Sequence, residues 1–354
     1  MKAYINGIGA VSPQNTLSED HFLDDVQAVE AHLLQVLKPD YKQFVSPKVL
    51  RRMSKIVRMS VAAAQTAMTE ASIEQPDAIL TGTGMGCQAD TEKFLNSVID
   101  NNEELLNPTA FIQSTHNTMG AQIALMLQNH NYNLTYVNRG FSFESALLDS
   151  LLLLAENKAK NVLLGGIDEI TEESLLISTK TGVYKKEPLN NLKLLDDKQE
   201  GALAGEGASF FMISNEKTDT SCARITAPET FYKPENISVI KEKITGFLNA
   251  RELAPENIDL ILYGYSGDKK AGHIYEQIEH DLFRQNAGAY FKHLSGEYDT
   301  AVAFAVWLGT KILKTGTVPE VIRRKNNSGS AVRNILIYNI SHNMYHSLIL
   351  LEEV

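Results

Sequence analysis

Residues 134–166, LTYVNRGFSFESALLDSLLLLAENKAKNVLLGG, decide the fold of this chain. A β-rich run from Leu134 to Val137 leads into a tight turn, Asn138-Arg139-Gly140, and then into a segment that is apolar almost all round. A second apolar run follows and ends at Gly165-Gly166. This order predicts a strand, a turn, a buried helix and a second buried strand, which is typical of an α/β protein.

The turn places Gly140 at the N-terminus of the predicted buried helix. Unpaired backbone N–H groups and the helix dipole stabilise negative charge at such a position. It therefore suits a thiolate nucleophile. Because glycine has no side chain, this seat is predicted to carry no nucleophile at all.

The composition is that of an ordinary globular protein. The 354 residues suffice for one large domain or two fused ones, with 44% hydrophobic and 21% charged residues. A net charge of -10 argues against a nucleic-acid or anionic-membrane surface. An acidic partner would need a local basic patch, and the sequence offers two candidates: Arg51, Arg52, Lys55 and Arg58 in the first half, and Arg323, Arg324 and Lys325 in the second. A solvated helix or loop is the simpler interpretation of both.

The opening residues and the cysteines bear on the compartment. MKAYINGIGAV is a β-type run rather than a secretory signal, and no apolar stretch approaches the length of a membrane span, so we expect a cytoplasmic protein. Two cysteines, Cys87 and Cys222, are too few for a disulfide framework. Neither CxxC nor HExxH spacing occurs, so no metal is expected. Residues 81–87, TGTGMGC, lack the GxGxxG spacing of a dinucleotide loop and favour close backbone packing instead, and no cofactor is expected.

Strands and helices alternate along most of the chain. Strands are predicted at residues 3–11, 78–81, 205–213, 258–263, 290–293, 334–340 and 346–351, and helices at 50–71, 111–127, 238–250, 273–285 and 301–313. Residues 171–200 read as surface loops and short helices. The alternation indicates a mostly parallel sheet covered on both faces. Its briefer repetition in the second half predicts two sequential halves, residues 1–215 and 216–354.

The opening stretch resembles the nucleophile segment of the β-ketoacyl synthases, condensing enzymes of the thiolase fold. In that family a cysteine opens the buried helix, with a serine two residues on and an alanine six residues on. Ser142 and Ala146 stand at these offsets from Gly140. The resemblance continues along the chain in YINGIGAVSPQ, RRMSKIVRMSVAAAQTAM, TGTGMG, NPTAFIQSTHNTMGAQIAL, GEGAS and KHLSGEYDTAVAF. It implies a thiolase-like fold with two similar βα halves packed as a layered α-β-α-β-α core.

The catalytic positions that this resemblance implies are all substituted. Condensation needs a cysteine thiolate and two histidines that stabilise the enolate. Gly140 occupies the cysteine position, Tyr265 falls at the first histidine with a shift of one residue left open, and Glu297 takes the place of the second, five residues after the retained Lys292. The family's C-terminal loop, which flanks the cysteine, has small residues, and here it carries His342, Met344 and Tyr345 instead. Together with Ser142, these three residues are expected to lie near the site.

A ketosynthase-like chain without catalytic residues implies a particular role. Ketosynthases are dimers in which one subunit helps to line the acyl pocket of the other, and in aromatic polyketide and aryl polyene systems the non-catalytic partner is called the chain-length factor. We therefore expect a non-catalytic subunit that pairs, as a heterodimer, with an active ketosynthase. That ketosynthase acts on chains bound to an acyl carrier protein in fatty acid, polyketide or aryl polyene biosynthesis. The residues expected at the interface and acyl pocket are Thr115, His116, Thr118 and Met119.

Two alternatives stay open at this point. The first is an acyl transferase or hydrolase of altered chemistry that uses Ser142 or a water oriented by Glu297, although a serine at a helix start ordinarily caps backbone N–H groups. The second is a homodimeric acyl-binding scaffold that has no ketosynthase partner.

Overall fold

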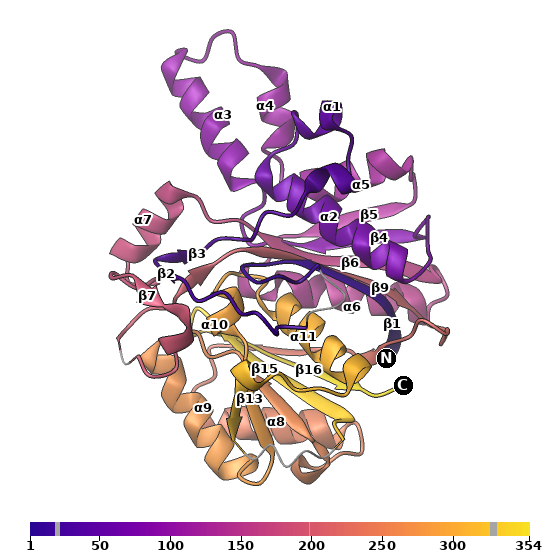
Figure 1. The fold of residues 1–354 in the computed structure, drawn as a ribbon, viewed down its shortest axis with the longest axis vertical. Helices are drawn as coiled ribbons and strands as arrows, with labels where there is room; N and C mark the ends of the chain where they lie inside the picture. The colour runs from indigo at the N-terminus through magenta and orange to yellow at the C-terminus, as the bar shows by residue number, and fades with distance from the viewer. Residues whose placement is uncertain (18–21, 198, 326–330) are drawn as a thin grey trace.

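The computed structural model describes residues 1–17, 22–197, 199–325 and 331–354. In this part of the chain, one 12-stranded sheet contains two strand sets of the same design (Figure 1). The first set has three parallel strands followed by two antiparallel ones: β5 (Tyr132–Tyr136), β4 (Ala78–Gly82), β6 (Asn161–Asp168), β9 (Gly207–Ser214) and β1 (Lys2–Val11). The second repeats it: β13 (Ala287–Tyr290), β12 (Leu260–Tyr263), β15 (Asn334–Ser341), β16 (Tyr345–Glu352) and β10 (Ala223–Thr226).

The two sets are joined by the antiparallel pairing of β1 with β10, in the register Lys2↔Thr226 to Ile5↔Ala223. Short strands complete the edges: β14 (Arg323–Lys325) pairs with β13, and β11 (Glu229–Tyr232) pairs with β16. Two small ribbons pair β2 (Glu30–Ala31) with β7 (Leu189–Asn190), and β3 (Leu33–Leu34) with β8 (Ala204–Gly205). The matching designs agree with a duplicated fold, while the boundary between residues 215 and 216 stays a prediction.

Helices form three layers around the two halves of the sheet (Figure 1). The buried helices α6 (Ser142–Ala155) and α11 (Val302–Thr315) lie between the halves. One outer face is covered by α2 (Lys55–Glu70) and α5 (Thr118–Leu127), the other by α8 (Ile237–Asn249) and α9 (Lys269–Leu282). The predicted α-β-α-β-α layering is therefore confirmed.

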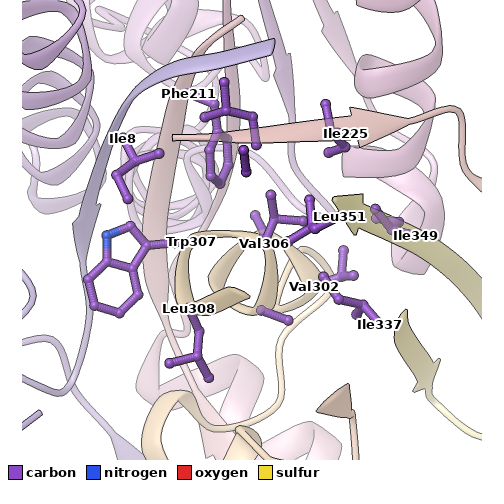
Figure 2. Packing of buried hydrophobic residues seen from close by; sticks show 14 of the residues in the cluster. Ile8, Phe211, Ile225, Val302, Val306, Trp307, Leu308, Ile337, Ile349 and Leu351 are labelled. Carbon is purple, nitrogen blue, oxygen red and sulfur yellow. The ribbon is translucent and has the colours of Figure 1, made fainter. Parts of the chain in front are cut away.

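The central layer carries the main hydrophobic core (Figure 2). Helix α11 is apolar on nearly all sides, so it can face both halves of the sheet at once. Its Trp307 and Val306 belong to one cluster with Ile8 and Phe211 of the first half and Leu351 of the second. Burial of this central helix is what holds the two halves around one site.

Two glycines of β1 let an outer helix come unusually close. A Cβ atom added at Gly7 would lie 2.1 Å from the carbonyl oxygen of Ala67, and one at Gly9 would lie 2.1 Å from that of Ala63. Only glycine fits such an approach without moving α2. The small residues of both elements therefore pack the backbone of α2 directly on β1.

The helix expected at residues 111–127 is broken into α4 (Pro108–Gln113) and α5. The cause lies in the polar residues between them, because the Thr115 hydroxyl donates to the Ile112 carbonyl oxygen at 3.1 Å and competes with the helical bonds. The helix expected at residues 50–71 is α2 and begins only at Lys55, and the separate short helix α1 (Pro47–Leu50) precedes it.

The segment expected as a strand at 290–293 is instead the end of β13 followed by α10 (Lys292–Ser295). Short strands such as β10 and β11 were missed because they pair at the junction or edge of the sheet and carry little pattern of their own. Residues 171–200 contain α7 (Glu172–Lys180) and turns, apart from residue 198, which lies outside the described part. No helix among the described residues is long and apolar enough to cross a membrane.

Candidate functional site

Gly140 lies in a short 3-10 turn, residues Arg139–Phe141, between β5 and the buried helix α6. The position has no room for a side chain. A Cβ atom added there would lie 2.9 Å from both Cβ and Cγ of Tyr345 and 3.0 Å from Cβ of Ser341. The ring of Tyr345 also packs edge-on against Phe141, with 5.0 Å between centroids. The seat therefore lacks a nucleophile and is filled from the opposite strand.

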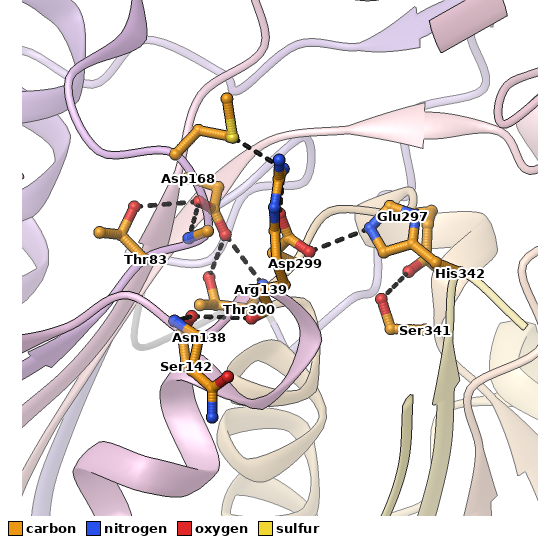
Figure 3. Close-up of polar contacts among 12 residues, drawn as sticks. Thr83, Asn138, Arg139, Ser142, Asp168, Glu297, Asp299, Thr300, Ser341 and His342 are labelled. Atoms are coloured by element: carbon orange, nitrogen blue, oxygen red, sulfur yellow. Dashed lines mark hydrogen bonds and ion pairs between the residues drawn. The ribbon is translucent and has the colours of Figure 1, made fainter. Parts of the chain in front are cut away.

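Ser142 holds the backbone of this turn (Figure 3). Its hydroxyl is fully buried, accepts a hydrogen bond from the backbone N–H of Asn138 at 2.8 Å and donates to the carbonyl oxygen of Arg139 at 2.7 Å. Arg139 has a φ of 49°, a strained value for a non-glycine residue. The Ser142 hydroxyl therefore donates its proton to a backbone carbonyl group, and its two hydrogen bonds stabilise a strained turn.

Glu297 and Lys292 form a buried ion pair. Nζ of Lys292 lies 2.5 Å from Oε2 of Glu297 and donates to the carbonyl oxygen of Ile340 at 3.1 Å, while the hydroxyl of Ser341 donates to Oε1 of Glu297 at 2.9 Å. Both charged side chains are at most 2% exposed. Burial lowers the pKa of Lys292, and the adjacent carboxylate of Glu297 opposes that shift. Both oxygens of Glu297 are therefore committed to internal partners.

The turn between β15 and β16 is pinned at both of its central residues. His342 and Asn343 have φ values of 50° and 57°, as in the type I′ turns that close hairpins. Nε2 of His342 lies 3.0 Å from Oδ1 of Asp299, and the amide of Asn343 donates to Asp268 at 2.7 Å. Burial disfavours the charged imidazole, but Asp299 outweighs it and raises the pKa of His342. These contacts hold Tyr345, two residues after Asn343 at the start of β16, beside Gly140.

Asp168, at the end of β6, ties three loops of the site together (Figure 3). Its carboxylate accepts from the Thr83 hydroxyl at 3.0 Å, from the Gly84 N–H at 2.7 Å, and from both the N–H and the hydroxyl of Thr300 at 2.8 Å. Burial, with a contribution from Asp299, raises the pKa of Asp168 to about 7. A Cβ atom at Gly84 would lie 1.9 Å from Oδ2 of Asp299, so the glycine-rich loop serves close packing.

A cavity of about 350 Å³ opens in front of these groups. Its lining includes the expected site residues Glu297, His342, Met344 and Tyr345, together with Arg139 and Ser266. Tyr265 points elsewhere and packs against Tyr275 and Tyr290, with ring centroids 6.3 and 5.7 Å away. Ser266, the next residue along the chain, lines the cavity instead, while which of the two corresponds to the family's first histidine stays a prediction.

The segment expected at the interface is held by its own hydrogen bonds. The hydroxyls of Thr115 and Thr118 lie 3.0 Å apart, and Thr118 also donates to the Ile112 carbonyl oxygen at 3.1 Å. His116 is exposed. Met119 is fully buried, with its sulfur 3.2 Å from the sulfur of Cys87. Its side chain therefore packs in the core of this chain, and the expected place of Met119 at an acyl pocket or interface stays a prediction.

Glu144, on the first turn of α6, is a site residue that sequence reasoning missed. Its carboxyl group is 1% exposed and neither oxygen has a hydrogen-bond partner of good geometry among the described residues, although Ser347 of β16 lies close by. Burial raises the pKa of Glu144 to about 7. A charged residue in the first turn of a helix rich in apolar residues was the signal in the sequence that could have identified Glu144. Asp168, Asp299 and Ser341 were missed as well, because their roles depend on partners far along the chain.

Comparisons with known proteins agree with this geometry. Residues 27–183 match the family model for the N-terminal domain of beta-ketoacyl synthases. A search of curated proteins gave no match. Among solved structures, the ishigamide ketosynthase/chain length factor has a TM-score of 0.80 at 16% identity, and a beta-ketoacyl synthase from Burkholderia phymatum STM815 has 0.77 at 13%; each alignment covers 100% of this chain and 99% of the other.

A further similar structure is a type II PKS acyl-carrier protein in complex with its ketosynthase bound to the hexaketide, AntDE:AntF, with a TM-score of 0.75 at 11% identity and the same coverage. The fold is therefore the thiolase-like fold of ketosynthases. Residues 27–183 are, more specifically, similar to the N-terminal domain of beta-ketoacyl synthases, and the whole chain shares its fold with a ketosynthase/chain length factor.

Proposed function

We propose that this chain is a non-catalytic, ketosynthase-like subunit of the chain-length-factor type that pairs with an active β-ketoacyl-ACP synthase. The observation that carries the proposal is the filled seat at Gly140, where an acyl thioester has neither a nucleophile nor space. Glu297 supports it, because a carboxylate at the second histidine position opposes an enolate and is bound by Lys292 and Ser341.

The structural neighbours support the pathway and the partners. One is described as a ketosynthase/chain length factor and another as a carrier protein in complex with its ketosynthase from a type II PKS. We therefore assign this chain a ketosynthase partner and an acyl carrier protein. Type II polyketide synthesis is the favoured setting, with fatty acid and aryl polyene synthesis as the other two.

The exposed edge of the first half supplies a surface for the ketosynthase partner. Strand β5 is the last strand of the sheet on its side, and an unpaired edge strand invites pairing with another chain. Exposed apolar residues lie on β5, just after it, and on α5 and α6, which contact it, namely Leu125, Tyr132, Leu134, Val137, Leu148 and Leu152. Phe111 and Ile112 of α4, shortly before α5 in the chain, are exposed as well. Apolar residues clustered in this way favour a protein interface.

The test of pairing is co-expression with a candidate ketosynthase, followed by size-exclusion chromatography and native mass spectrometry. We expect a 1:1 complex with the unaltered chain and none with Leu125→Glu, whose side chain is 72% exposed on α5. Leu176→Glu on α7, 56% exposed and outside this face, is the matched control and should leave the complex intact. Equal effects of the two substitutions would count against the face, and a stable homodimer that ignores every ketosynthase would favour the scaffold alternative.

The altered-enzyme alternative is tested by intact-mass spectrometry after incubation with acyl donors. The hydroxyl of Ser142 is buried and its proton is held by the carbonyl oxygen of Arg139, so we expect no adduct on the isolated protein. A stable acyl adduct on Ser142 would overturn the non-catalytic assignment.

We also propose that Thr115 and Thr118 lie near the floor of the partner's acyl pocket. Both residues are half-buried and hydrogen-bonded to each other, so the larger side chain of a phenylalanine has to project into the adjoining space. Replacing either threonine with phenylalanine should shorten the products of an intact, active heterodimer, whereas His116→Phe, at a more exposed neighbour, is the comparison. Product length that stays constant for all three substitutions would contradict a role for this segment.

A further inference from the structure

A second cavity, of about 360 Å³, lies where the loop at residues 38–42 meets the start of α2. It is separate from the site at Gly140, since the two cavities share no lining residue. The cations Lys38, Lys42, Lys55 and Arg58 line it, together with the ring of Tyr41 and the apolar side chains of Pro39 and Leu50. Such a lining combines positive charge with an apolar wall.

Two side chains that line this cavity each carry a polar atom that is buried behind its wall without a hydrogen-bond partner among the described residues. The two atoms are Nε of the half-buried Arg58 and the hydroxyl oxygen of Tyr41. Burial raises the pKa of Tyr41 to about 12, with nearby Arg58 opposing the shift, so the phenol keeps its proton. Folded proteins seldom leave buried donors unpaired, because the lost hydration is not replaced. Both atoms are donors, and both are satisfied by a ligand that supplies acceptors.

The charges around the cavity favour an anion. Asp40 is the acidic residue of the lining, and its carboxylate already accepts the N–H of Lys42 at 3.1 Å. Glu206 lies behind Lys55 and is paired with it at 2.6 Å. Lys38, Lys42 and Arg58 therefore leave a local positive excess in a chain of net charge -10. Phosphate, with up to two negative charges and several acceptor oxygens, matches a hydroxyl, a guanidinium and ammonium groups better than a carboxylate does.

We propose that this cavity is a binding site for a small organic phosphomonoester. Binding turns the side chains of Arg58 and Tyr41 toward the cavity, so that the phosphoryl group accepts hydrogen bonds from Nε of Arg58 and from the Tyr41 hydroxyl, with Lys38 and Lys42 at the rim. The organic part packs on Pro39 and Leu50. The volume of this open cavity, about 360 Å³, suits a small molecule. This assignment stands independently of the proposed pairing with a ketosynthase, because it uses none of the residues at Gly140 or on β5.

The test is isothermal titration calorimetry of the full chain with inorganic phosphate and with phenyl phosphate. We expect phenyl phosphate to bind more tightly, since its ring covers the apolar wall. Arg58→Gln should weaken binding by about tenfold or more and Tyr41→Phe by a smaller factor. Arg52→Gln removes the same charge from an exposed neighbour that does not line the cavity, and it should change the affinity by less than about twofold. Equal losses in Arg52→Gln and Arg58→Gln would overturn the site in favour of diffuse attraction, as would weaker binding of phenyl phosphate than of inorganic phosphate.

Thermal unfolding supplies an independent readout. In phosphate-free buffer, Tyr41→Phe should be at least as stable as the unaltered chain, because it removes an unpaired buried hydroxyl. Added phenyl phosphate should raise the Tm of the unaltered chain and of Arg52→Gln, and raise it less in the Arg58 and Tyr41 variants. A marked loss of stability in phosphate-free Tyr41→Phe would show that the hydroxyl has an internal partner and would overturn the proposal. So would the absence of saturable binding at millimolar concentrations.

Discussion

The site at Gly140 and the cavity beside α2 treat buried charge in opposite ways. Around Gly140, Lys292 is matched by Glu297 and His342 by Asp299, each within hydrogen-bond distance. Beside α2, Nε of Arg58 and the hydroxyl of Tyr41 have no such partner among the described residues. A centre whose polar groups satisfy one another has nothing left to offer a substrate, whereas unmatched donors indicate that a ligand supplies the acceptors.

The largest effect that tests this comparison is expected when one partner of the buried ion pair near Gly140 is removed. Lys292→Met removes the cation from a buried pair and leaves Glu297 uncompensated, which should lower the free energy of unfolding by about 3–5 kcal/mol. Urea denaturation followed by circular dichroism measures it. The double variant Lys292→Met with Glu297→Gln should recover a large part of the loss, because the stranded charge is gone.

Arg224→Met is the matched control for that measurement, since Arg224 pairs with Glu352 at 3.0 Å in a part-exposed setting. We expect it to cost less than about 1 kcal/mol. Similar losses for the buried and the part-exposed pair would show that the interior of the site is far better hydrated than its burial indicates.

Glu144 is the exception within the first site, and its titration sharpens the comparison. Its pKa in the folded protein, about 7, lies above the ordinary 4.5, so the folded state holds a proton that the unfolded state releases and stability falls as the pH rises from about 4.5 to 7. Glu144→Gln should remove this fall and be more stable than the unaltered chain at pH 8 by up to about 3 kcal/mol.

The measurement is the difference in unfolding free energy between the two proteins across pH 4.5 to 8, which cancels the parallel contributions of Asp168 and Glu169, whose pKa values burial also raises to about 7. Glu235→Gln, which removes an exposed carboxylate elsewhere on the chain, is the matched control for this comparison. A difference that does not grow with pH would mean that Glu144 is charged and compensated in the folded protein.

A smaller effect is expected on restoring the nucleophile. Gly140→Cys forces a Cβ atom against Tyr345 and Ser341 and should destabilise the protein by about 1–3 kcal/mol without giving condensation. Adding Tyr345→Gly should relieve most of that loss and increase the rate at which iodoacetamide alkylates the new thiol. Measurable condensation by the single variant, or equal stability with and without Tyr345, would contradict the filled seat.

The sequence predicted the elements whose pattern is local. The apolar run after Gly140 was sufficient for α6, and the spacing of Ser142 from that glycine was sufficient to locate the empty seat. The contacts that fill the seat were out of reach, because Tyr345 arrives from a strand more than two hundred positions away. The orientation of Tyr265 was also beyond a linear pattern, since packing against Tyr275 and Tyr290 decides which of two successive loop residues faces the cavity.

The same limit applied to burial within one segment. Thr115 and Met119 stand four residues apart and share a helical face on paper, yet a break between α4 and α5 leaves the first near the surface and encloses the second beside Cys87. The sequence identified Arg58 as one member of a basic cluster. Only the three-dimensional structure could show that its Nε is buried without a hydrogen-bond partner among the described residues.

The pairing of β1 also has a consequence for how the chain is made. β1 ends at Val11, but its neighbours in the sheet, β9 and β10, begin only at Gly207 and Ala223. At ordinary rates of synthesis the ribosome takes on the order of 10–40 s to produce the intervening chain. For that time an apolar strand destined for the centre of the molecule has no pairing partner, so a chaperone that shields the nascent N-terminus should raise the yield of this protein more than one that acts after release.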